Sequence, residues 1–246
     1  DYEGLIYDGA YSNYIVKNSK LGLIGDDIDE EVAKNKVKEF LGTEKVEDIK
    51  SNGLISGENI ESYSFTVKIK GKNEKVDIEI SKKGGWIVEI IDNRNVGEAK
   101  ISQEEAVKKG KEFLSSKGYN NMKETYYIKQ ENIVTINYAY MDDIIMYPDL
   151  IKVKIALDNG DILGMESMGY LNAHTTRNFL EEKITIDEAR STLNKDLEIL
   201  SEGKAVIPLD NNKEAYCYEF KGKVEGKEFL VYINAQTGEE EEILTI

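Results

Sequence analysis

Few residues in this chain could act as nucleophiles, general bases or metal ligands. The 246 residues include one cysteine, Cys217, and one histidine, His174. A lone cysteine excludes an internal disulfide, and a structural zinc site needs more thiolates or imidazoles than these two side chains provide. Cys217 lies in a strand-like run of aromatic residues, where a buried, unreactive thiol is the favoured interpretation. We therefore expect no metal site and no cofactor.

Adjacent acidic residues are the other candidates for catalysis. Glu30 with Glu31, and Glu104 with Glu105, could suggest the paired carboxylates of glycoside hydrolases. Neighbouring positions on a helix point about 100° apart, so such a pair cannot flank one glycosidic bond. Acids in a first helical turn offset the helix dipole, which explains both pairs better. Because no serine or cysteine motif makes His174 a triad base, we predict no catalytic residue and a protein that is not an enzyme.

The elements that carry these residues repeat along the chain. The sequence Lys-Glu-Phe-Leu occurs at residues 38–41 and again at 111–114, and a looser copy of the same unit begins at residue 184. Such self-similarity usually means that one supersecondary unit is used several times, a design commoner in binding than in catalysis.

Each unit begins with an amphipathic helix and continues with strands. The apolar stripes are Ala33, Val37, Phe40 and Leu41; Ala106, Gly110, Phe113 and Leu114; and Ala189, Leu193, Leu197 and Leu200. Ser102 with Glu105, and Thr185 with Glu188, have capping-box spacing. After each helix the apolar period changes to two over three strands, with a glycine turn before the last.

We therefore predict an α+β fold of three tandem units, each with one helix packed on a small antiparallel sheet. A lead-in segment spans residues 1–25. The units span 26–95, 96–172 and 173–246, the last including a linker, and residues 169–183 show no clear period.

Charge and hydropathy exclude two classes of partner. The formal net charge is −15, from 32 basic and 47 acidic residues, and it repels nucleic acid and anionic lipid. No run of about 18 apolar residues is present, so we predict no membrane span in this sequence. The chain begins at Asp1, and we interpret it as a fragment or processed form whose targeting segment lies elsewhere.

Three stretches are more distinctive than the repeat itself. They are residues 147–160, beginning Tyr-Pro-Asp-Leu; residues 169–177, with Gly-Tyr-Leu followed by His174 and Arg177; and residues 217–240. These stretches resemble the PepSY-domain family, and the whole chain resembles the C-terminal region of the YpeB spore germination proteins. Residues 6–12 are similar too, although Ala10 and Tyr11 replace the usual proline and phenylalanine.

The resemblance implies a regulatory binding protein without catalytic residues. Its expected partner is a cortex-lytic peptidoglycan hydrolase similar to SleB, which it would bind, stabilise and regulate. The expected location is the spore envelope, extracytoplasmic on the cortex side of the inner membrane, with membrane attachment only through a missing N-terminal segment. One alternative is a propeptide-like inhibitor of a secreted protease, with residues 169–183 entering the active site. Another is a peptidoglycan hydrolase.

Three residues of the joining stretch are candidate contacts between units or with a partner: Tyr170, His174 and Arg177. His174 could set the angle between units two and three or form a pH-sensitive partner contact, although an ordinary linker hydrogen bond is the favoured interpretation. The acidic run at residues 239–242 either attracts a basic partner or protects a sheet edge, and the sequence does not favour one over the other.

Overall fold

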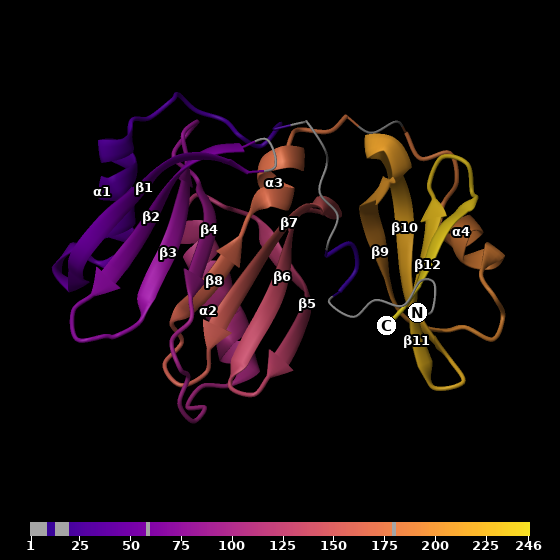
Figure 1. Ribbon diagram of the computed structural model, residues 1–246. Helices are drawn as coiled ribbons and strands as arrows, with labels where there is room; N and C mark the ends of the chain where they lie inside the picture. The colour runs from indigo at the N-terminus through magenta and orange to yellow at the C-terminus, as the bar shows by residue number, and fades with distance from the viewer. Residues whose placement is uncertain (1–8, 13–19, 58–59, 179–180) are drawn as a thin grey trace.

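Helices alternate with groups of strands along the chain. The computed structural model describes residues 9–12, 20–57, 60–178 and 181–246 (Figure 1). The predicted α+β class is confirmed. Residues 1–8 and 13–19 of the expected lead-in lie outside the described residues, as do residues 6–8 of the stretch that resembles the family.

Each of three helices is followed by a group of strands. The elements are α1 (Glu30–Leu41), η1 (Thr43–Lys45), β1 (Val46–Gly57), β2 (Ile60–Ile69), β3 (Lys75–Ser81) and β4 (Ile87–Asp92); α2 (Gln103–Ser116), β5 (Met122–Gln130), β6 (Ile133–Asp142), β7 (Ile144–Ala156) and β8 (Ile162–Glu166); then α3 (Met168–Ala173), α4 (Ile186–Thr192), β9 (Glu198–Leu209), η2 (Asp210–Asn212), β10 (Lys213–Val224), β11 (Lys227–Asn234) and β12 (Glu240–Thr245).

Side chains cap the first turn of these three helices. The N-cap residues Asp29, Ser102 and Thr185 each accept a hydrogen bond from a backbone N–H three residues later. The capping box predicted at Thr185 and Glu188 is confirmed in full, whereas at Ser102 the structure shows the serine half. The acidic pairs at 30–31 and 104–105 lie in the first turns of α1 and α2, as expected for groups that offset the helix dipole.

The number of strands differs from the prediction, because four strands follow α1, α2 and α4 instead of three. The additional strands are β1, β5 and β9. Their burial does not alternate cleanly: in β5 the buried Met122 is followed only by half-buried and exposed residues, and β9 changes from mainly exposed residues at 198–202 to buried residues at 205–208. A strand at an edge or across a seam lacks one continuous buried face, so its sequence carries little period-two signal.

The strands form one sheet, which corrects the prediction of small separate antiparallel sheets. Within the described residues, the strand order is β1-β2-β3-β4-β8-β7-β9-β10-β11-β12, and β6 joins β5 to β7. All pairings are antiparallel except β7 with β9, which is parallel and short, at Ile145–Ala205 and Met146–Val206. The sheet is therefore mixed, and it branches at β7 (Figure 1).

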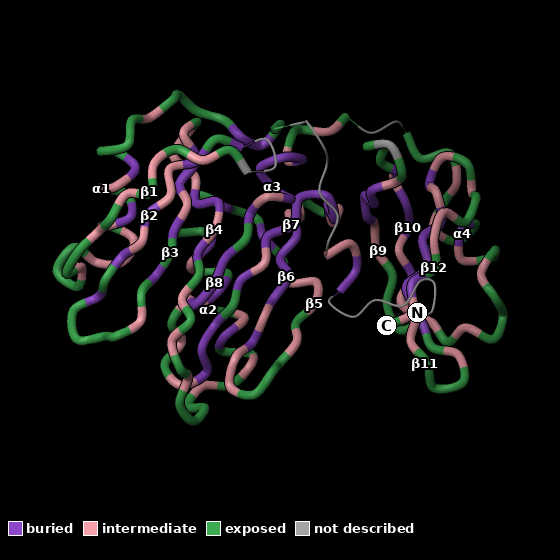
Figure 2. Tube along the Cα trace, viewed as in Figure 1, coloured by how far each residue is buried: buried purple, intermediate pink, exposed green. Residues whose placement is uncertain are grey.

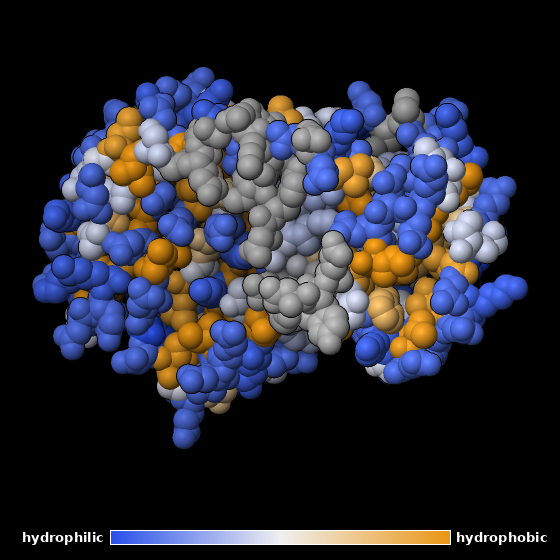
Figure 3. All heavy atoms as spheres, turned by 45° about the vertical axis from the view of Figure 1, so that its right-hand side comes forward, coloured by the Kyte–Doolittle hydropathy of each residue, from blue (hydrophilic) through white to orange (hydrophobic). Residues whose placement is uncertain are grey.

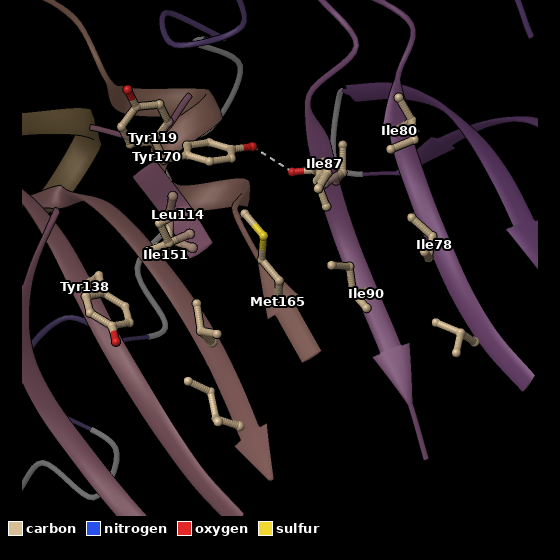
Figure 4. Packing of buried hydrophobic residues seen from close by; sticks show 14 of the residues in the cluster. Ile78, Ile80, Ile87, Ile90, Leu114, Tyr119, Tyr138, Ile151, Met165 and Tyr170 are labelled. Carbon is tan, nitrogen blue, oxygen red and sulfur yellow. Dashed lines mark hydrogen bonds between the residues drawn. The ribbon is translucent and has the colours of Figure 1, made fainter. Parts of the chain in front are cut away.

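The hydrophobic core is shared by the first two helices. One cluster contains Ala33 of α1 and Leu114 of α2, both fully buried, with residues of β2 to β4 and β6 to β8. Figure 4 shows part of it, where the Tyr119 hydroxyl donates to the Ile87 carbonyl at 2.8 Å. Buried residues line the middle of the strands, and exposed ones lie at many of the turns (Figure 2).

Two smaller clusters lie on opposite faces of β9 to β12. Cys217, Leu230 and Tyr232 face β7, whereas Ala189 of α4 packs with Phe220 and Val231 on the other face. Successive residues of a strand point to opposite faces, which explains the division. The three-unit boundaries stay predictions.

Two further expectations for residues 169–200 are wrong. Residues 169–173 of the joining stretch, for which no period was expected, lie in α3 (Met168–Ala173). Helix α4 ends at Thr192, so Leu197 and Leu200 do not continue its stripe. An Asx turn follows α4, because the Asn194 side chain accepts from the N–H of Asp196. None of the helices in the described part of the chain is long and apolar enough to cross a lipid bilayer.

Candidate functional site

A three-residue bulge in β7 creates the most distinctive polar cluster of the molecule. Ala139 of β6 pairs with Leu150, but the next residue, Tyr140, pairs with Met146. Residues 147–149, Tyr-Pro-Asp, are therefore left outside this ladder, and Pro148 has no N–H to donate to it. The bulge lies between the part of β7 that pairs with β8 and the part that pairs with β9.

Asp149 presents a fully buried carboxylate from this bulge. The Arg177 guanidinium donates to both of its oxygens, from Nη1 to Oδ2 at 2.9 Å and from Nη2 to Oδ1 at 2.7 Å. His174 Nδ1 lies 2.7 Å from Oδ2. A buried charge is tolerated only when it is paired and hydrogen-bonded, and this carboxylate meets both conditions.

Arg177 also binds a second carboxylate, on β10. Its Nε lies 2.7 Å from Glu214 Oε2, and Nη2 lies 2.8 Å from Oε1. Only 8% of the Arg177 side chain is exposed. Burial lowers the pKa of Arg177, but the hydrogen bonds to Glu214 and Asp149 outweigh burial and raise its pKa above the ordinary value. One guanidinium thus connects β7 with β10.

Helix α3 holds the ring of His174 in place. The Tyr170 ring stacks on the imidazole, with centroids 4.3 Å apart and an interplanar angle of 15°, and Tyr140 packs at 4.5 Å. Burial, followed by the charge of Asp149, raises the pKa of Tyr170 to about 12. Gly169 allows α3 to approach β7, because a Cβ there would lie 2.8 Å from the Leu150 carbonyl oxygen.

Tyr147 makes a second connection from the bulge to β10. Its hydroxyl donates to Glu219 Oε2, and its ring packs edge-on against Tyr232 of β11, with centroids 6.1 Å apart. Burial raises the pKa of Glu219, and the hydrogen bond from Tyr147 compensates only in part. Tyr11 packs on both rings and donates to Glu242 at 3.0 Å. We call these contacts, with those of Asp149, His174, Arg177 and Glu214, the junction site.

The junction site is equipped for structural contact. Asp149 and Glu214 are bonded to the Arg177 guanidinium, and Glu219 is bonded to the Tyr147 hydroxyl. Tyr147 and Glu219 also line a cavity of about 550 Å³, with Leu230 and Ile246. Cys217 is buried nearby, and burial raises the pKa of its thiol to about 12, which disfavours the reactive thiolate. Among the described residues, no group of three or more His, Cys, Asp or Glu is arranged to hold a metal ion.

The structure brings the three predicted contact residues together. Tyr170 and His174 stack, and His174 and Arg177 share the carboxylate of Asp149. Whether they also touch a partner stays a prediction.

Sequence reasoning missed four of the groups that complete the site: Asp149, Glu214, Tyr147 and Glu219. One signal was available, since a proline followed by an acid interrupts an otherwise apolar strand at 148–149. Glu214 and Glu219 carry no comparable signal, because surface strands contain many such residues.

Two models of known protein families match this chain. A family model described as the YpeB sporulation, PepSY1 and PepSY2 domains matches residues 1–180. A second, described as the peptidase propeptide and YPEB domain, matches residues 183–244. The fold and these matches define a protein of the PepSY-domain class.

Curated relatives show which family within this class the chain resembles. The protein named sporulation protein YpeB from Halalkalibacterium halodurans is 34% identical to this chain, over 88% of this chain and 48% of its own length. The protein of the same name from Oceanobacillus iheyensis is 30% identical, over 91% of this chain and 50% of its own length. The Bacillus subtilis protein of that name is 31% identical over 75% of this chain and 42% of its own length. The chain belongs to the YpeB sporulation protein family. It spans about half the length of these curated relatives.

A solved structure shows the same fold. The Bacillus megaterium YpeB C-terminal domain superposes with a TM-score of 0.79 at 26% identity, covering 90% of this chain and 99% of that one. The predicted resemblance to the YpeB C-terminal region is confirmed.

Proposed function

We propose that this chain is a non-enzymatic module that binds, stabilises and regulates a cortex-lytic peptidoglycan hydrolase similar to SleB. Membership of a sporulation protein family supports a role in spore formation or germination. The hydrolase partner, the regulation and a location in the spore envelope, on the cortex side of the inner membrane, are parts of the proposal. The tandem arrangement of three PepSY-like units is a further part, supported by the order helix and four strands, which occurs three times.

The observation that carries the proposal is the bonding of Arg177 to Asp149 and Glu214. This guanidinium fixes β10 relative to the β7 bulge, and its two carboxylate partners lie 28 and 37 residues away in the sequence. A buried ion pair can add little net stability, and we take the role of this one to be fixing the relative position of the two strands. Rigid placement of two surfaces lowers the entropic cost of binding a partner across them, which suits a recognition module.

The inhibitor alternative receives less support from the structure. Residues 169–183 were its candidate for entering a protease active site. Residues 169–173 are instead buried in α3, and Arg177 is held by two carboxylates. A segment tied down in this way is poorly suited to insertion into another protein.

The proposal is tested with the purified chain and the purified SleB-like hydrolase of the same organism. We expect the chain to prolong the survival of the hydrolase under limited proteolysis and to change its rate of cortex peptidoglycan cleavage. An unrelated acidic protein of similar size is the control for nonspecific protection. If the survival and the cleavage rate both stay the same, the proposal is wrong.

A further inference from the structure

The third helix of the repeat is too short to cover its sheet. Ala33, Ala106 and Ala189 lie at the same position after each N-cap, and all three are fully buried. Helices α1 and α2 continue beyond this anchor and meet at Phe40 and Phe113, whose rings pack edge-on with centroids 5.5 Å apart. Helix α4 ends at Thr192, before it could make an equivalent contact.

An apolar groove lies where the longer helix would have continued. It has a volume of about 220 Å³ and lies between the residues that follow α4 and the ends of β10, β11 and β12. Its apolar lining consists of Leu193, Leu197, Val224, Phe229, Val231 and Ile243. Figure 3 turns this side of the molecule toward the viewer, and hydrophobic atoms are visible there between hydrophilic side chains.

The groove borders an open sheet edge. Strand β12 is the last in the strand order, and within the described residues it pairs only with β11. Its side chains alternate between two environments. Leu244 is 5% exposed in the cluster that faces β7, whereas Ile243 points to the groove and is 43% exposed. An edge strand offers free backbone N–H and C=O groups to another strand.

The negative charge along this edge favours a basic ligand. Residues 239–242 are four consecutive glutamates, and no ion pair involves them in the part of the chain that the structure describes. Glu240 lies beside the groove, and Glu242 points to the other face, where Tyr11 donates to it. With a net charge of −15, a second copy of the chain would be repelled.

We propose that the edge of β12 binds an extended, basic segment of a partner protein by strand addition. The partner's backbone pairs with β12, and an apolar side chain enters the groove beside Ile243. Lysine or arginine side chains on the alternate positions lie on the opposite face, where Glu242 points. This inference rests on the proposed function only in taking the ligand to be a protein, and it does not depend on which protein that is.

The test uses a fluorescent peptide of about seven residues in which lysine and valine alternate. Fluorescence anisotropy should show saturable binding to the chain. Ile243→Arg should weaken binding about tenfold or more, because the substitution fills the groove and adds a repelling charge. Leu54→Arg, on the edge strand β1, is the matched control, since Leu54 is 45% exposed; it should leave binding unchanged.

Two further peptides separate strand addition from simple charge attraction. A peptide of the same composition with its lysines in one block should bind more weakly, and so should one with N-methylated backbone amides on the pairing side. Circular dichroism checks that Ile243→Arg is folded. The inference is overturned if the alternating peptide does not bind the chain. It is also overturned if Ile243→Arg binds this peptide as tightly as the unmodified chain does, or if the N-methylated peptide or the peptide with its lysines in one block binds as tightly as the alternating peptide. If those results occur while the hydrolase still associates with the chain, only this inference fails and the proposed function stands.

Discussion

Arg177 and Asp149 form a two-point ion pair in which the carboxylate is fully buried and the guanidinium side chain is 8% exposed. The pair lies where β7 changes its neighbour from β8 to β9, and Arg177 extends it to Glu214 on β10. Together with the hydrogen bond from Tyr147 to Glu219, it fixes the last four strands to the rest of the molecule.

Replacing Arg177 should destabilise the protein strongly. Arg177→Met leaves the Asp149 carboxylate buried without its main partner, which costs about 3–5 kcal/mol of unfolding free energy. Urea denaturation followed by circular dichroism measures this loss. The double substitution with Asp149→Asn should recover part of it, because no unpaired buried charge remains.

Arg190→Met is the matched control for that experiment. Arg190 also binds two carboxylates, Asp187 and Glu202, but its side chain is 36% exposed. Exposed ion pairs contribute less than about 1 kcal/mol. Equal losses for the two arginines would contradict the role assigned to the junction site.

Gly169 should not tolerate a side chain. In Gly169→Ala, the new Cβ would lie 2.8 Å from the Leu150 carbonyl oxygen, so α3 must move away from β7. We expect a loss of about 1–3 kcal/mol in thermal or urea unfolding. Gly203→Ala is the comparison, since nothing lies within 4 Å of a Cβ there; a similar loss for both variants would argue against the close approach of α3.

Asp158 should stabilise the protein at neutral pH and lose this effect in acid. Hydrogen bonds from Arg94 hold the pKa of Asp158 below its ordinary value. The carboxylate is then charged in the folded state, and its contribution is fully present above the unfolded pKa of about 3.9 and lost as the pH falls below it. Asp158→Asn should cost about 1–2 kcal/mol near pH 7 and less near pH 3 in urea denaturation. An equal cost at both values would contradict the assignment.

Glu219 should have the opposite dependence on pH. Burial raises its pKa, so the folded protein retains the proton longer than the unfolded chain does. The free energy of unfolding then falls as the pH rises from the pKa of glutamate in the unfolded chain, about 4.3, through the higher pKa of Glu219 in the folded protein. Glu219→Gln still offers an oxygen to Tyr147 and should reduce this fall, raising stability near pH 7 relative to the unmodified chain. Urea denaturation from about pH 4 to pH 8 measures it, and an unchanged pH profile would count against a buried carboxylate.

Local signals predicted local structure well. The caps at Ser102 and Thr185, with the buried alanines that follow them, are encoded within one helical turn, and α1 and α2 lie where the apolar stripe places them. Helix α4 was predicted too long, because its stripe of leucines continues through the turn that Asn194 forms with Asp196.

Long-range features could not be predicted in the same way. The joining of all strands into one sheet depends on short pairings such as Ile145 with Ala205, which involve few residues and leave no period in the sequence. The partners of Arg177 are similarly distant along the chain. The distinctive stretches at 147–160 and 169–177 did contain Asp149 and His174, but only the β7 bulge shows why they belong together.

We propose that this chain binds a cortex-lytic hydrolase by direct contact. Sedimentation velocity of the two purified proteins, alone and mixed at about 10 μM each, tests it most simply. Our account predicts a new, faster-sedimenting species of defined stoichiometry that is reduced by Arg177→Met and retained by Arg190→Met. Two independent boundaries that keep their separate sedimentation coefficients in the mixture would contradict it.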